Sequence, residues 1–155
     1  MTKLIASLVC IASMACAGAN ERSLVLGSAI SIQYANVDTP CPEDSICLDG
    51  WFRYDLSIDK VLKGPAVPHR IRAVHMQHTY YIPKYRRALR LFVLRPVETA
   101  EARANLKADY YIDDLSPVQE LYCLSGTPES LGLDPSAVTV VGQERFCFSA
   151  EEARR

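Results

Sequence analysis

The sequence predicts an all-β protein: a small, partly open β-barrel with one short helix, stapled by disulfides. Three observations predict this class. Apolar residues recur at every second position along several segments, which is the period of a strand with one buried face. Only one segment, 99–107, carries the signals of a helix. Four of the six cysteines lie beyond an apparent leader, and an even number in an exported domain indicates disulfides.

Residues 1–19 have the pattern of a secretory signal peptide. Lys3 supplies a positive start, an apolar run follows, and Ala17-Gly18-Ala19 is a small-residue cleavage site. Cleavage there would make Asn20 the first mature residue and place the protein in the periplasm or outside the cell. The alternative is lipoprotein processing at Cys16, which would leave a lipid-anchored cysteine. No later run is long and apolar enough to predict a transmembrane helix.

Without the leader, 136 residues remain, enough for a single domain over 20–150 followed by a frayed tail at 151–155. Loss of Lys3 leaves 16 basic residues against 18 acidic ones, a formal charge of −2. This balance excludes a general nucleic-acid binder, because such a protein needs a net basic field.

The segment 51–62 shows the clearest period-two pattern and organises the chain. A break in its apolar row near Asp59 predicts a bulge, and Gly64-Pro65 ends the strand. Its apolar residues all fall on one face of an extended backbone, and they are Phe52, Tyr54, Leu56 and Ile58.

Two further strands flank this segment. Residues 24–34 form the first, with a kink at Gly27-Ser28, and the turn-rich segment 36–49 follows it. Residues 70–81 form the third strand. Its apolar row changes side between Ala73 and Val74, which predicts another bulge.

The second half begins with a strand over 89–94 that is apolar on both faces, which predicts a central position. A helix over 99–107 follows, with Thr99 as its N-cap and Lys107 in its last turn. Beyond the helix we expect a hairpin of 110–112 and 119–124, interrupted at Asp113-Asp114. A loop or a single helical turn should follow over 127–136. Two late strands are expected at 138–141 and 145–148.

The four mature cysteines allow three disulfide pairings. We favour Cys41–Cys47, which closes a short loop, together with Cys123–Cys147, which ties the end of the chain to an inner strand. The longer loop should add about 3 kcal/mol by restricting the unfolded chain. A zinc site fits poorly, because one close pair followed by two widely separated cysteines lacks the usual ligand spacing.

Two short motifs, Val61-Leu62-Lys63-Gly64-Pro65 and Leu91-Phe92-Val93-Leu94, lie in a strand, turn, strand, loop, strand order over 24–96. In this part the chain resembles exported domains of the netrin and tissue-inhibitor-of-metalloproteinase type. The resemblance implies an OB-like barrel. Those inhibitors bind the target's zinc through a first mature cysteine, and they hold many more cysteines. Because Asn20 is predicted at that position here, the resemblance does not carry over the inhibitory residues.

Aromatic and basic residues alternate in the loop after the third strand. Such residues can stack on sugars or bases and hold phosphate or sulfate, and OB barrels bind ligands through loops. The alternative is that the tyrosines cover one end of the barrel while the cations stay solvated. In an exported protein we expect a protein or an anionic glycan or envelope component as partner, rather than nucleic acid. The candidate binding residues are Tyr80, Tyr81, Lys84, Tyr85, Arg86 and Arg87.

Three histidines, His69, His75 and His78, lie within one segment and would suit a metal site for a hydrolase. On a regular strand His69 and His75 share a face and His78 points away, but the predicted bulge would bring His69 and His78 together. The alternative is that they are exposed strand or loop residues. Sequence therefore favours a non-enzymatic binding or inhibitor-like module with no cofactor and no catalytic residue, over a hydrolase or a structural envelope (lipo)protein.

Overall fold

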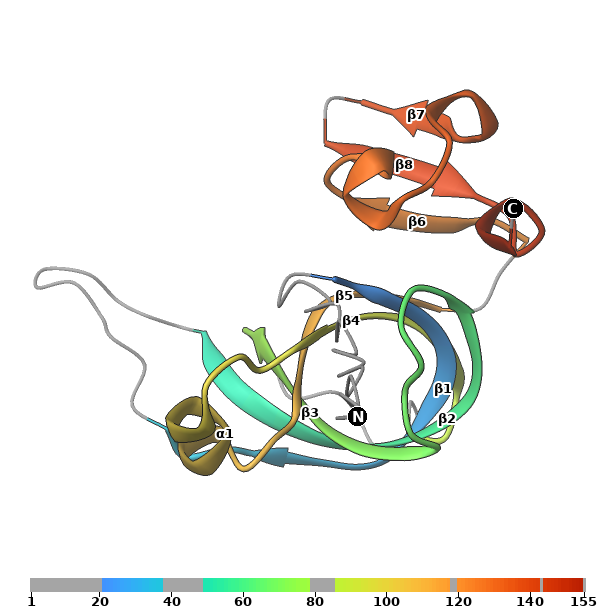
Figure 1. Cartoon of the computed structure of the whole chain (residues 1–155). Helices are drawn as coiled ribbons and strands as arrows, with labels where there is room; N and C mark the ends of the chain where they lie inside the picture. Colours follow the sequence, from blue (N-terminus) through green and yellow to red (C-terminus); the bar gives the residue numbers. More distant parts are fainter. Residues whose placement is uncertain (1–20, 38–48, 79–85, 118–119, 143, 155) are drawn as a thin grey trace, which may run out of the picture.

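The computed structural model describes residues 21–37, 49–78, 86–117, 120–142 and 144–154. The described residues form eight strands, one short α-helix and three 3₁₀ turns. Five strands close into a barrel, and the other three form a small sheet beside it (Figure 1).

The barrel strands follow the order β1-β2-β3-β5-β4, and β4 returns to pair with β1. Neighbouring strands are antiparallel except β3 and β5, which run parallel. The predicted fold class, an all-β, OB-like barrel with one short helix, is confirmed. The barrel is closed, however, and not partly open as the sequence suggested. Its strands are β1 (Ser23–Tyr34), β2 (Gly50–Lys63), β3 (Arg70–Gln77), β4 (Leu89–Pro96) and β5 (Tyr110–Pro117).

Alternate residues of these strands fill the barrel, as the period of two requires. The four apolar residues predicted to share one face of β2 are all buried inside it. The core they join is Val25, Ala29, Ile32, Phe52, Tyr54, Leu56, Ile58, Ile71, Ala73, Phe92, Leu94 and Ile112.

Irregular pairing lets the long strands β1 and β2 bend around the barrel. Leu26 faces Lys60 while Gly27 faces Ile58, so Asp59 is the extra residue, and the bulge predicted there is confirmed. A Cβ on Gly27 would lie 2.5 Å from the carbonyl oxygen of Ser57. The predicted kink therefore needs glycine, because the two backbones approach too closely for any side chain.

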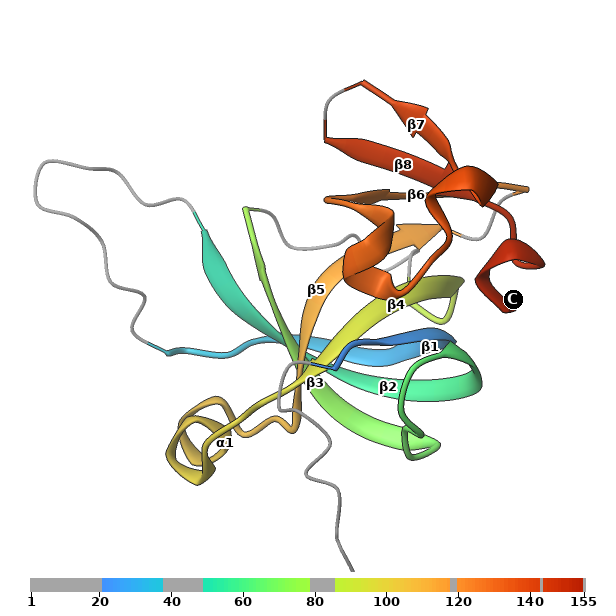
Figure 2. The same cartoon turned by 45° about the horizontal axis from the view of Figure 1, so that its top comes forward.

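The small sheet covers the outside of β1 and β4 and creates a second core (Figure 2). Its strands, in the order β6-β8-β7, are β6 (Tyr122–Ser125), β8 (Arg145–Phe148) and β7 (Thr139–Val141). Leu91 and Val93 of β4 are buried against it, whereas Phe92 and Leu94 are buried inside the barrel. The prediction that this strand is buried on both faces is confirmed. The second core is Leu24, Leu91, Val93, Tyr122, Leu124, Leu133, Phe146, Phe148 and Ala153.

A disulfide joins Cys123 and Cys147, which face each other across β6 and β8, with an S–S distance of 2.06 Å. This confirms one of the two favoured pairings. Cys41 and Cys47 lie outside the described residues, so the other pairing stays a prediction. Where the sequence predicts a loop or a single helical turn over 127–136, two 3₁₀ turns begin at prolines, η2 (Pro128–Leu131) and η3 (Pro135–Ala137), and Gly132 ends the first.

Helix α1 (Ala100–Leu106) forms where the sequence predicts it. Thr99 accepts a 3.1 Å hydrogen bond from the backbone N–H of Ala102, and Lys107 ends the helix in the left-handed conformation. The helix packs outside the barrel against Val74 and Trp51. The bulge predicted between Ala73 and Val74 is wrong, since β3 pairs with β2 without interruption. Val74 is apolar because α1 covers the outer face of the strand.

The predicted hairpin of 110–112 and 119–124 is also wrong. Residues 110–117 form one strand, β5, which pairs with β3 and β4, while β6 pairs with β8. Val93 faces Asp114 and Leu94 faces Ile112, so Asp113 is the extra residue of a bulge. A polar pair that suggested a turn is therefore a bulge inside a barrel strand.

Near the end of the chain, Glu152–Arg154 form the 3₁₀ turn η4, in which Ala153 is fully buried. The described part of the predicted frayed tail therefore contains a turn, and residue 155 lies outside the described residues. Among the helices in the described ranges, none has the length and apolar character needed to cross a membrane.

Candidate functional site

Charged residues gather on the outer wall of β2 and β3, the face turned away from the core. Arg53 and Asp55 of β2 alternate with buried residues and so point outward, as do Arg70 and Arg72 of β3. The register places Asp55 opposite Arg72. Residues directly opposite each other in antiparallel strands form the closest cross-strand pairs, so the strand register itself assembles this cluster.

Hydrogen bonds fix the positions of these side chains. Nε of Arg72 donates to Asp55 at 3.2 Å, and its Nη1 donates to the carbonyl of Lys107 at 3.4 Å. Nε of Arg53 donates to the carbonyl of Leu106 at 3.0 Å. The two arginines therefore tie the C-terminal end of α1 to the barrel wall and are themselves held in place.

Asp55 is held ionised by its neighbours. The Ser31 hydroxyl donates a 2.5 Å hydrogen bond to this carboxylate. That bond lowers the pKa of Asp55, and Arg72 and Arg53 lower it further, while partial burial acts in the opposite direction. The carboxylate is thus a fixed negative charge between two guanidinium groups.

An open groove of about 470 Å³ lies beside this cluster. Two cationic groups, Arg70 and Arg72, and two carboxylates, Asp55 and Asp109, line it. We call this surface the charged wall. The groove is lined by Ile30, Asp55, Leu56, Arg70, Ile71, Arg72 and Asp109.

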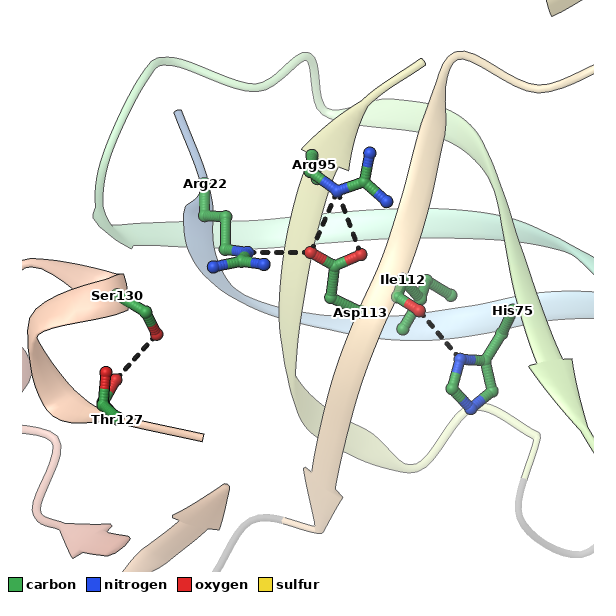
Figure 3. A network of polar contacts seen from close by, with 7 residues as sticks. All are labelled: Arg22, His75, Arg95, Ile112, Asp113, Thr127 and Ser130. Atoms are coloured by element: carbon green, nitrogen blue, oxygen red, sulfur yellow. Dashed lines mark hydrogen bonds and ion pairs between the residues drawn. The ribbon is translucent and has the colours of Figure 1, made fainter. Parts of the chain in front are cut away.

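A second polar network lies on β5, where the bulge turns Asp113 outward between two arginines (Figure 3). Nε of Arg22 donates to this carboxylate at 2.8 Å, and Nε of Arg95 contacts both of its oxygens at 3.1 and 3.2 Å. Asp114 accepts 2.7 Å bonds from the backbone N–H groups of Leu115 and Ser125. These aspartates tie β5 to β4, to β6 and to Arg22, which directly precedes β1, so their partners indicate a structural role.

The three histidines have three separate partners. Nδ1 of His69 lies 2.6 Å from the carbonyl oxygen of Ile58, and Nδ1 of His75 lies 2.8 Å from that of Ile112 (Figure 3). Nδ1 of His78 lies 2.8 Å from the carboxylate of Asp49. Because β3 has no bulge at Val74, His69 and His78 are not brought onto one face. No cluster of three or more potential metal ligands occurs in the ranges that the structure describes.

The predicted binding loop is described only at its far end. Tyr80, Tyr81, Lys84 and Tyr85 lie outside the described residues. Arg86 is partly buried, and Arg87 is exposed in the left-handed conformation, with its N–H donating to the carbonyl of Ala29 at 3.0 Å. The loop therefore rejoins the barrel at β1, and its role in binding stays a prediction.

Arg70, Arg72 and Asp109 were not predicted as site residues. The alternation of Arg70 and Arg72 along β3 was visible in the sequence, but the pairing of Arg72 with Asp55 depends on the β2–β3 register. Comparison with protein-family models, curated proteins and solved structures found no match to this chain. The barrel and its disulfide are therefore established from the structure alone, and the likeness to netrin-type domains stays a prediction.

Proposed function

We propose that this protein is an exported, non-enzymatic binding module that holds an anionic glycan on the charged wall of its OB-like barrel. The observation that carries the proposal is the groove on the outer wall of β2 and β3, which is lined by the guanidinium groups of Arg70 and Arg72 beside two carboxylates. Arg53 adds a third guanidinium group on the same wall. OB-type barrels bind oligosaccharides and oligonucleotides on the same strand 2–3 face. This step is an analogy of fold, and the chemistry of the side chains must support it independently.

The side chains support an anionic ligand in two ways. Guanidinium groups present planar donors that match carboxylate or sulfate oxygens, and they stay charged at any relevant pH. Arg53 and Arg72 are also held by carbonyl groups of the α1 end, so little side-chain freedom is lost on binding. Arg70 is exposed at the groove and provides a third guanidinium group.

Export is supported by the leader pattern of 1–19 and by the Cys123–Cys147 disulfide, which is consistent with an oxidising compartment. The proposal places the mature protein in the periplasm or outside the cell, with anchoring through Cys16 as the alternative. The loop containing Arg86 and Arg87 would add basic groups to the binding surface.

The test measures retention of the mature protein on a sulfated polysaccharide column under a salt gradient. Arg70→Glu reverses one charge in the groove, and Arg145→Glu makes the same change on the exposed part of β8 as a matched control. We expect the Arg70 variant to elute at clearly lower salt, and the Arg145 variant to elute like the wild type. Equal losses in both variants would reveal non-specific charge attraction, and unchanged retention in the Arg70 variant would exclude the charged wall.

A further inference from the structure

A second groove, of about 390 Å³, lies where the segment leading into α1 passes over β2, β4 and β5. Unlike the charged wall it is built around two aromatic rings, those of Trp51 and Tyr111, whose centroids are 5.9 Å apart with planes inclined at 48°. We call it the aromatic groove. It is lined by Trp51, Arg95, Glu98, Thr99, Ala102 and Tyr111.

The rings are held rigidly from behind. Both pack against the small core of Val74, Val97, Leu106 and Ala108 between α1 and the barrel. The guanidinium of Arg95 lies 4.5 Å from the centre of the Tyr111 ring and is fixed in turn by Asp113. A site formed by such constrained groups loses little conformational freedom when a ligand enters.

We propose that the aromatic groove binds one neutral sugar ring of an oligosaccharide, stacked on the indole of Trp51. One face of a pyranose ring carries C–H groups with slight positive charge, which pack well against the negative face of an aromatic ring. The ring's hydroxyl groups need donors and acceptors at the rim, and Arg95 and the exposed Glu98 provide them.

The charges of the groove favour a neutral ligand over a charged one. An aromatic pair beside a carboxylate would also suit a quaternary ammonium group. Here, however, the Arg95 guanidinium already lies over Tyr111 and would repel a second cation. The positive charge of Arg95 balances the negative charge of Glu98. The groove therefore offers no net attraction to an anion either.

This site is independent of the anionic ligand proposed above, because different residues form it. Trp51 and Arg53 do point outward from the same strand, two residues apart. The two grooves therefore lie on the same barrel wall, one near each end of α1, and an acidic polysaccharide long enough to reach both could occupy them together.

Trp51 is the only tryptophan in the chain, so its fluorescence reports on this groove without labelling. The mature protein would be titrated with the trimers of N-acetylglucosamine, glucose and mannose to about 10 mM, because one stacked ring with a few hydrogen bonds corresponds to a Kd of about 1 mM. We expect at least one trimer to give a saturable change in Trp51 emission.

Ala102→Phe fills the groove and should abolish that change, and Ala104→Phe places the same side chain on the exposed side of α1 as the matched control. Glu98→Ala, a milder change at the rim, should weaken binding several-fold. The proposal is overturned if no trimer changes the emission of the wild type, or if the change persists in Ala102→Phe. Arg70→Glu should leave the sugar response intact, so failure of this proposal is distinguishable from failure of the charged wall.

Discussion

Replacing Leu91 with alanine tests whether the small sheet and the barrel form one cooperative structure. Leu91 is 0% exposed, yet it points out of the barrel into the second core. A Leu→Ala change at a fully buried site costs about 3 kcal/mol, from lost burial and the cavity left behind. That is a large part of a typical stability of about 5–15 kcal/mol, and it should lower the melting temperature by about 10 °C in a chain of this size.

Leu89 provides a matched control, because it lies on the same outward face of β4 but is 42% exposed. Leu89→Ala should change stability by at most about 1 kcal/mol. Urea unfolding would be followed both by circular dichroism and by the fluorescence of Trp51, which lies on the α1 side of the barrel.

We expect the two signals of Leu91→Ala to shift together to lower urea. If Leu91→Ala unfolds at the same urea concentration as Leu89→Ala, the outer face of β4 is not covered in solution. If the Trp51 transition stays in place while the dichroism shifts, the sheet and the barrel unfold separately.

The remaining predictions concern the disulfide and Asp55. Replacing Cys123 and Cys147 together with alanine should lower the free energy of unfolding by about 3 kcal/mol, measured by urea unfolding; an unchanged midpoint would contradict this. Because the folded pKa of Asp55 is depressed, its stabilising contribution should be complete above its unfolded value near 3.8 and should disappear as the pH falls through the folded pKa. Ser31→Ala should raise the pKa of Asp55 in an NMR titration of the carboxyl carbon, because it removes the largest cause of the shift; an unchanged pKa would refute the assignment of that cause.

Local pattern predicted the strands well, because each strand's own residues show which face is buried. The pattern does not show what covers the other face. Val74 suggested a bulge, because an apolar residue on the outer side of a strand is explained either by a bulge that turns it inward or by another element that covers it. Here α1 covers it, and β3 has no bulge at that point. The apolar outer face of β4 has the same kind of cause, since Leu91 and Val93 lie under the small sheet.

Polar pairs were interpreted less reliably than apolar patterns. Asp113-Asp114 suggested a turn, because neighbouring aspartates usually favour one. In the fold Asp113 binds Arg22, which is 91 residues away in the chain. The charged wall was missed for the same reason: Asp55 and Arg72 are 17 residues apart, and only the register brings them together.

The pairing of β1 with β4 has a consequence for the order in which the chain folds. β1 is made first but gains its second neighbour only when β4 has emerged, so one of its edges stays unpaired while the intervening strands are made. Unpaired edges invite intermolecular pairing, and contacts this distant in sequence form slowly. Until the barrel closes, residues 23–34 are therefore a point at which the nascent chain is exposed to aggregation.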